Sequence, residues 1–133
     1  MLRVVLDTNV LVSAIISDGK SRELLKRGIA NQYSLVTSDL ILKELVTVIR
    51  RPKFKTSEDE VHRTILALIR TANVVSVKTK LKAVKEDPKD DMIIETAVDG
   101  AADMIVTGDG HLLALETFRR IKILTVEEML ACL

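Results

Sequence analysis

A short apolar run that ends at a carboxylate constrains this chain more than any other feature. Residues 2–6 have the apolar content of a fully buried strand, and Asp7 follows at once. In an open α/β sheet, the last residue of a parallel strand faces the crevice in which such folds bind ligands. Asp7 is therefore expected at a functional site. The structural alternative is a helix cap, because Asp often caps helices and an apolar helix is expected from Asn9 to Ile16.

Apolar segments that alternate with helical patterns predict the rest of the fold. Further strands are expected at residues 33–37, 73–77, 103–107 and 121–124, with helices between them. Such alternation is typical of a mostly parallel sheet covered by helices on both faces. We therefore expect an α/β protein, a three-layer α/β/α sandwich with a five-stranded sheet. The length of 133 residues fits a single domain over residues 1–133.

Helix starts are predicted from small polar residues that precede helical periodicity. Such residues accept hydrogen bonds from the first N–H groups of a helix, which have no partner within the helix itself. The residues expected to cap helices in this way are Ser21, Ser38, Ser57, Asp87 and Thr125.

Composition excludes several classes of protein. The chain has no Trp, one Tyr and two Phe, which are too few aromatics for a platform that stacks bases. A net charge of +1 excludes binding of nucleic acid through overall charge. A single cysteine, Cys132, and two histidines predict neither a disulfide nor a zinc site, and they fit a reducing, cytoplasmic compartment. No apolar run approaches the roughly 20 residues of a membrane span, so no membrane association is expected.

Local charge is more informative than net charge at residues 50–55. Arg50, Arg51, Lys53 and Lys55 crowd into a connection that Pro52 interrupts. A solvated surface loop is the ordinary interpretation of such a cluster. Closely spaced cations on one exposed connection could also bind the phosphates of a nucleic acid. Candidate RNA-binding residues are therefore Arg50, Arg51 and Lys53.

Two further acids lie where a helix or a strand meets the expected site. Glu44 has Ile41 and Val48 as helical neighbours, which places it at the edge of a buried stripe. A boundary glutamate paired with a lysine is the structural alternative. Asp109 follows the strand that ends at Thr107, although it also has the position of a cap on the next helix.

The acidic segment before the fifth helix offers several candidates. Asp87 and Asp90 have the spacing of a capping pair, so both have structural explanations. Asp91 lies one position too late to cap, and its neighbours Ile94 and Val98 place it at the rim of the apolar stripe. Asp91 is therefore preferred as the functional acid. A favourable interaction with the helix dipole is the alternative for Asp91.

A right-handed, doubly wound sheet brings these acids together. Its first and fourth strands lie side by side at the switch point, so Asp7 and Asp109 are expected next to each other. Glu44 and Asp91 would be offered by helices at the same edge. Carboxylates that converge on one crevice repel one another, and a hard cation with oxygen ligands, Mg²⁺ or Mn²⁺, is the natural occupant.

The order and spacing of these residues resemble the PIN-domain nucleases over the whole chain. The similarity lies in the runs Asp-Thr-Asn at 7–9, Asp-Pro-Lys-Asp-Asp-Met at 87–92 and Val-Thr-Gly-Asp-Gly-His-Leu-Leu at 106–113, together with Glu44. The chain is similar in particular to the toxin-like branch of prokaryotic toxin–antitoxin pairs, whose nucleases are called VapC-like.

The resemblance implies a function for the acids. Residues in the positions of Asp7, Glu44, Asp91 and Asp109 bind Mg²⁺ or Mn²⁺ and cut RNA in that family, and the metal activates a water for attack on the phosphodiester. It further implies an RNA substrate, an antitoxin protein as partner and pairing into homodimers. Supporting roles are expected for Asn9, Thr107 and Asp90.

Two other functions compete with this one. A phosphatase of the haloacid dehalogenase type needs a second Asp two residues after the first, where Asn9 stands. A PIN-like module that binds RNA or protein without cutting is the stronger alternative. Four mutually repelling carboxylates argue against it, because a module without chemistry has no use for them. His111 is expected at a helix start rather than in contact with substrate.

Overall fold

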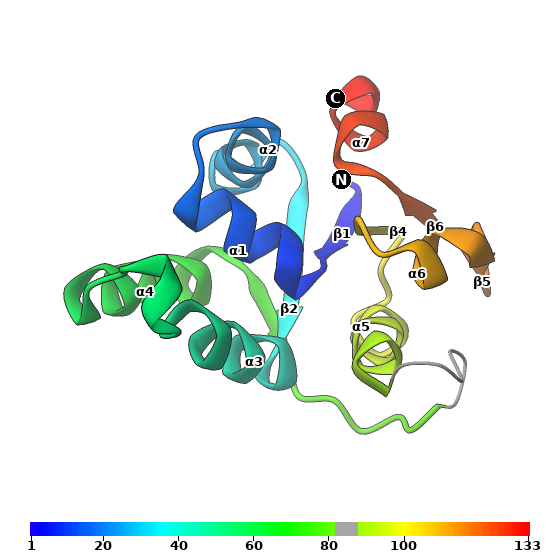
Figure 1. Cartoon of the computed structure of the whole chain (residues 1–133). Helices are drawn as coiled ribbons and strands as arrows, with labels where there is room; N and C mark the ends of the chain where they lie inside the picture. The colour runs from blue at the N-terminus through cyan, green and yellow to red at the C-terminus, as the bar shows by residue number, and fades with distance from the viewer. Residues whose placement is uncertain (82–87) are drawn as a thin grey trace.

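The computed structural model describes residues 1–81 and 88–133, which form an α/β fold (Figure 1). The elements in chain order are β1 (Arg3–Leu6), α1 (Thr8–Ile16), α2 (Lys20–Ile29), β2 (Ser34–Ser38), α3 (Asp39–Ile49), the 3₁₀ helix η1 (Pro52–Phe54), α4 (Glu58–Thr71), β3 (Asn73–Val75), α5 (Pro88–Asp99), β4 (Met104–Val106), α6 (Gly110–Leu115), β5 (Thr117–Phe118), β6 (Ile121–Leu124) and α7 (Val126–Cys132). None of the described helices is both long enough and apolar enough to span a membrane.

The strand β1 lies inside the sheet, between β2 and β4. Val5 pairs with Val36 of β2 on one side and with Ile105 of β4 on the other, and both pairings are parallel. Val5 has no exposed surface, as expected for a strand covered on both faces. The order β3-β2-β1-β4-β6-β5 confirms the expected mostly parallel sheet.

Helices cover the two faces of this sheet (Figure 1). α1, α2 and α7 lie on one side, where α2 packs against both α1 and α7. α5 packs across β1, β2 and β4 on the other side. α3 and α4 continue the helical layer beside α1 and α2. The expected three-layer arrangement is therefore confirmed.

The strand order contains one switch point, between β1 and β4. The chain adds β2 and β3 on one side of β1, then returns to add β4 and β6 on the other. Leu6 pairs with Val106 at the carboxyl ends of these two strands. The residues that follow them, Asp7 and Thr107, therefore leave the sheet side by side, as a doubly wound fold requires.

The sheet has one strand more than the five expected from the apolar pattern. β5 is two residues long and pairs antiparallel with β6, with Phe118 opposite Ile121. Arg119 and Arg120 form the turn between them, with φ values of 48° and 74°. Two-residue hairpin turns of this kind usually contain Asn or Gly. A pair of arginines therefore gives no sequence signal for the hairpin.

Three of the predicted caps are confirmed. The hydroxyls of Ser38, Ser57 and Thr125 each accept a hydrogen bond, 3.1 Å long, from the backbone N–H three residues on. At Thr125 the bond is reciprocated, because Glu128 accepts from the Thr125 N–H at 3.0 Å. The terminal helix thus begins with a complete capping box.

The prediction that Ser21 caps the second helix is wrong. α2 begins at Lys20, and Gly19 is its N-cap. Glycine is a good N-cap without a side-chain bond, because it leaves the first N–H groups open to water. Ser21 is instead a half-buried residue within the first turn. The predicted cap Asp87 lies outside the described residues.

Acidic side chains of α5 hold an irregular segment, residues 76–81, that continues from the edge strand β3. Asp99 accepts the backbone N–H of Lys78 at 2.7 Å and of Thr79 at 3.0 Å, and it also accepts the Thr79 hydroxyl. Glu95 accepts the N–H of Leu81 at 2.7 Å. The Thr79 hydroxyl, followed by these backbone donors, lowers the pKa of Asp99 below its ordinary value of 3.8.

This lowered pKa predicts an acid-dependent loss of stability. A carboxyl group whose pKa is lower in the folded state stabilises the fold above its unfolded pKa, and that contribution falls as the pH drops through the folded pKa. The free energy of unfolding of Asp99→Asn should therefore lie below that of the parent at pH 6. The difference should shrink as the pH falls below about 4. Urea unfolding across this range measures it, with Asp18→Asn in the exposed turn after α1 as control. A constant difference between parent and Asp99→Asn over the whole pH range would contradict this account.

Candidate acidic active site

Asp7 stands at the end of β1, where the central strand meets α1. Its backbone N–H donates to the carbonyl of Val106 at 2.9 Å, which joins the ends of β1 and β4. The residue is 6% exposed, and its Oδ1 accepts the N–H of Asn9 at a long 3.4 Å. Asp7 is therefore the N-cap of α1 and also the first acid of the site.

Thr107 connects Asp7 to the loop that carries Asp109. Its hydroxyl is fully buried, donates to Asp7 Oδ2 at 2.6 Å and accepts the backbone N–H of Asp109 at 3.0 Å. One hydroxyl thus orients the carboxylate after β1 and the backbone after β4. Both halves of the switch point are held by the same side chain.

Asp109 is also a helix cap. Its Oδ1 accepts the backbone N–H of His111 at 2.8 Å and of Leu112 at 3.3 Å, so it begins α6. The two explanations considered for Asp7 and for Asp109 are therefore compatible. Each acid caps a helix at the carboxyl edge of the sheet. The capping bonds orient the carboxylate of Asp109, whereas the Thr107 hydroxyl orients that of Asp7.

A small polar cavity of about 60 Å³ lies where these acids meet two further helices. Glu44 reaches it from the middle of α3 and is half-buried. Asp90 reaches it from the first turn of α5 and is 5% exposed. The residues that line the cavity are Asp7, Thr8, Asn9, Glu44, Asp90, Met92, Ile93 and Asp109.

The structure brings Asp90, rather than Asp91, to this cavity. Asp91 is 9% exposed and is not among the described residues that line it. Asp90 lies at positions i, i+3, i+4 and i+7 with Ile93, Ile94 and Ala97, all of which are buried. That spacing puts Asp90 at the head of the stripe that faces the sheet. The sequence already contains this spacing, but the interpretation of Asp90 as part of a capping pair does not use its place on the buried stripe.

His111 lies beside the acids in a way that the sequence analysis did not anticipate. Asp90, Asp109 and His111 each offer one potential ligand atom, and these atoms lie within 4.8 Å of one another. His111 is exposed, and its Nδ1 is 3.9 Å from Asp109 Oδ1. Its position two residues after a capping Asp is the one signal that could have suggested this proximity.

Burial raises the pKa of Asp7 above its ordinary value of 3.8. The hydrogen bond from Thr107 and the backbone N–H groups oppose this change, while the negative charge of Asp109 adds to it. The charged form of Asp7 is thus destabilised by desolvation and by a neighbouring acid. A cation in the cavity would relieve both effects.

The donor groups of the cavity fit a hard divalent cation. Carboxylates come from four separate segments of the chain, namely the ends of β1 and β4 and the helices α3 and α5. Carboxylate oxygens are the ligands that Mg²⁺ and Mn²⁺ prefer. The ring nitrogen of His111 is a donor that Mn²⁺ accepts more readily than Mg²⁺ does.

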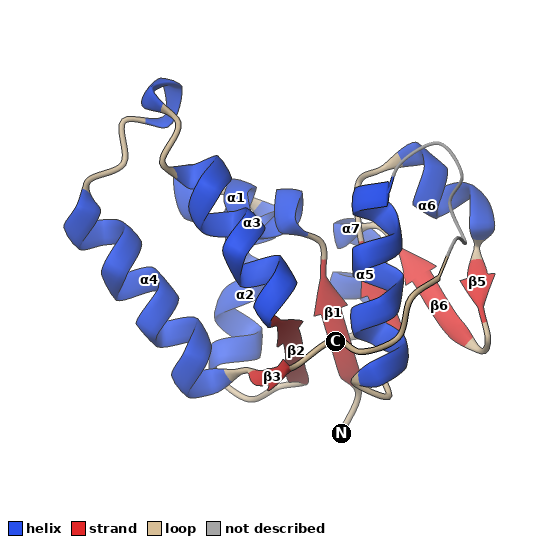
Figure 2. Ribbon diagram, turned by 90° about the horizontal axis from the view of Figure 1, so that it is seen from below, coloured by secondary structure: helices blue, strands red, loops and turns tan. Residues whose placement is uncertain are grey.

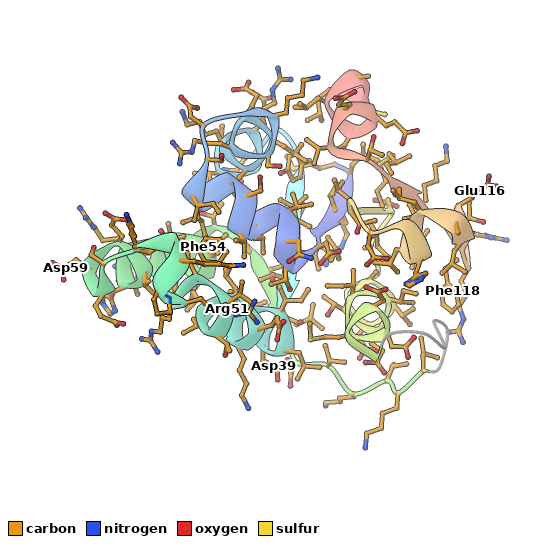
Figure 3. All side chains as sticks on the ribbon, in the orientation of Figure 1. Asp39, Arg51, Phe54, Asp59, Glu116 and Phe118 are labelled. Carbon is orange, nitrogen blue, oxygen red and sulfur yellow. The ribbon has the colours of Figure 1, made fainter. Side chains whose placement is uncertain are left out.

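The basic connection at residues 50–55 lies on the side of the molecule toward which β1 points (Figure 2). Arg50 is paired with Glu58 at 3.0 Å, and Lys53 lies 5.0 Å from the ring centre of Phe54. Arg51 is exposed, and Figure 3 shows it together with Phe54 on the segment between α3 and α4. The cations and the acidic cavity therefore share one side of the fold.

Comparisons with known proteins give a family and two structural neighbours. A family profile described as PIN domain matches residues 3–111. A chain of VapBC2 from Rickettsia felis, a complex crystallised with a DNA fragment from its promoter, superposes with a TM-score of 0.63 at 14% identity, covering 93% of this chain and 98% of that one. PAE2754 from Pyrobaculum aerophilum gives a TM-score of 0.64 at 16% identity, covering 98% and 88%.

A search of curated proteins gave no match. The two structural neighbours support the fold alone at these identities. The profile covers most of the chain, from the start of β1 to the first turn of α6, and so includes every acid of the cavity. On this ground, the chain belongs to the PIN-domain family.

Proposed function

We propose that this protein is a ribonuclease that depends on Mg²⁺ or Mn²⁺ and cleaves RNA phosphodiester bonds by attack of water. The observation that carries the proposal is the convergence of Asp7, Glu44, Asp90 and Asp109 on one small cavity. Acids from four segments would repel one another without a cation. Membership of the PIN-domain family supports the same conclusion.

The chain's own residues have separable roles in this proposal. Asp7, Glu44, Asp90 and Asp109 would hold the ion, which when bound lowers the pKa of water and offsets charge on the phosphate. Thr107 keeps the Asp7 carboxylate directed into the cavity through its 2.6 Å hydrogen bond. Asn9, exposed on the rim, would bond the substrate. Asp91, the acid first preferred, is assigned no ligand role.

We further propose that the protein is the toxin of a toxin–antitoxin pair, acts in the cytoplasm and forms homodimers. Its fold superposes on a chain of VapBC2 over nearly the full length of both chains. An antitoxin protein would then be its partner. The antitoxin would bind at a surface that keeps RNA away from the acidic cavity.

Cleavage of RNA tests the proposed chemistry directly. The parent protein with Mn²⁺ should cut a mixed RNA substrate and leave 5′-phosphate and 3′-hydroxyl ends, because water rather than the ribose 2′-hydroxyl attacks. Chelator should abolish cutting, and Asp7→Asn should reduce its rate at least about 100-fold. Asp59→Asn on the exposed start of α4 is the matched control and should cut like the parent. Product ends and rates are read on sequencing gels.

Two outcomes would contradict the proposal. Ends carrying a 2′,3′-cyclic phosphate would exclude attack by water. RNA that is bound but not cut with either metal would instead favour a PIN-like module that binds RNA without cleaving it.

Melting curves separate the two adjacent acids of α5. Saturating Mn²⁺ should stabilise the parent by about 2.7 kcal/mol at a hundredfold excess over the dissociation constant. Asp90→Asn should remove most of that gain, and its stability in chelator should equal or exceed that of the parent because a repulsion is lost. Asp91→Asn, the same change one residue away, should keep the gain. A full response to Mn²⁺ in Asp90→Asn would remove Asp90 from the proposed ligands.

The basic connection makes a separate prediction about RNA binding. Arg51→Ala combined with Lys53→Ala should weaken RNA binding and reduce the salt slope of the binding constant by about 1.4, at roughly 0.7 per phosphate contact on a single strand. Arg119→Ala combined with Arg120→Ala removes the same charge from the turn between β5 and β6, at the opposite end of the sheet (Figure 2). That control should leave the slope unchanged. Equal slopes for both double variants would make residues 50–55 a solvated loop.

A further inference from the structure

A second cavity, outside the acidic cavity of the proposed chemistry, lies between α1 and α7. Its volume is about 420 Å³. The start of α2 and the loop after β4 complete its walls. We call it the α1–α7 groove, and its lining residues are Asn9, Val10, Ser13, Ser21, Thr107, Gly108, Thr125, Val126 and Glu127.

The groove adjoins the candidate active site. Asn9 lines both the groove and the acidic cavity. Thr107 lines the groove, and its hydroxyl bonds Asp7 of the acidic cavity at 2.6 Å. A chain molecule with one unit at the acids would therefore have its neighbouring unit at the mouth of the groove.

The groove lining combines aliphatic walls with hydroxyl groups. Val10 and Val126 supply apolar surface, while Ser13, Ser21 and Thr125 supply hydroxyls that both donate and accept hydrogen bonds. The Thr125 hydroxyl accepts from the Glu128 N–H and retains its own proton for donation. Small-molecule sites of 300–1,000 Å³ are usually built this way, with apolar walls and a few polar groups.

Two features leave the groove open to a flat, polar unit. A side-chain carbon added at Gly108 would meet no atom within 4 Å, so the backbone of the loop can be approached closely. At the outer end, Lys20 is paired with Glu127 at 3.0 Å across α2 and α7. The Lys20 ammonium offsets part of the negative charge that Glu127 brings to the groove.

We propose that the α1–α7 groove binds the base and ribose of the nucleotide beside the scissile phosphate and so selects the cleavage position. This inference rests on the proposed ribonuclease function. Hydroxyls that donate and accept match the edges of bases and the ribose 2′-hydroxyl. None of the described residues that line the groove is aromatic, so recognition is by hydrogen bonds and aliphatic contact and favours particular bases.

Nucleosides without phosphate test the groove independently of catalysis. ¹H–¹⁵N spectra of the parent are recorded in chelator with adenosine, guanosine, cytidine and uridine at millimolar concentrations. At least one nucleoside should shift the amides of Ser13, Ser21, Gly108 and Val126. Ser13→Leu, which fills the groove from α1, should weaken that binding at least about tenfold. Ser17→Leu at the exposed end of the same helix should bind like the parent.

A second variant and a second measurement distinguish loss of nucleoside binding from loss of folding. Ser21→Leu fills the groove from α2, and circular dichroism melts establish that each variant is folded. On RNA with Mn²⁺, both groove variants should cut at altered positions relative to the parent, whereas Ser17→Leu should keep the parent's pattern.

The outcomes separate this proposal from the proposed function. Nucleoside shifts in the groove without RNA cutting overturn the nuclease, and with it the role of the groove in selecting a cleavage position, and leave only nucleoside binding. RNA cutting with no nucleoside shifts and an unchanged cleavage pattern in both groove variants overturns the subsite alone. Nucleoside shifts that persist in folded Ser13→Leu and Ser21→Leu also overturn it. An added peptide that shifts these amides while nucleosides do not would assign the groove to a protein partner.

Discussion

The parallel pairing of β1 with β4 is the interaction on which the rest of the structure depends. It places Leu6 opposite Val106 and joins Asp7 to the Val106 carbonyl, so the two strands end at the same edge. Thr107 then connects the carboxylate after one strand to the backbone after the other through a single buried hydroxyl. Asp7 and Asp109 are 102 residues apart in sequence, and without this pairing they would be unrelated in space. The cavity and the groove both open at this edge.

The burial of a carboxylate at that edge, next to a second acid, has an electrostatic cost that packing does not offset. Burial and the charge of Asp109 both raise the pKa of Asp7, while the donors from Thr107 and the backbone lower it. Two like charges about 4 Å apart repel each other by about 4 kcal/mol at an effective dielectric near 20. The cation proposed for this site would turn the same carboxylates into a source of stability. The exposed cations of residues 50–55 lie on the same side of the molecule (Figure 2).

The acids of the site are also structural residues. Asp7 caps α1 and Asp109 caps α6, each with one carboxylate oxygen bonded to backbone N–H groups. Capping residues have few rotamers, because the bond to the helix start fixes the side chain. A cap at the carboxyl edge of a strand is therefore a rigid carboxylate at the place where α/β folds bind ligands. Helix capping and metal binding therefore do not exclude each other, because one carboxylate can cap a helix and also face the cavity.

The sequence by itself determined the α/β class, the mostly parallel sheet and the emergence of Asp7 beside Asp109, because apolar periodicity and crossover handedness limit the topology. Tertiary structure decided what local patterns leave open. Asp90 and Asp91 both have local roles on a helix, and only the direction in which α5 faces the sheet brings Asp90 to the cavity. β5 depends on a turn of two arginines in a conformation that no local preference predicts. The proximity of His111 to Asp90 and the α1–α7 groove both arise from segments distant in sequence, whose packing no single stretch of the chain encodes.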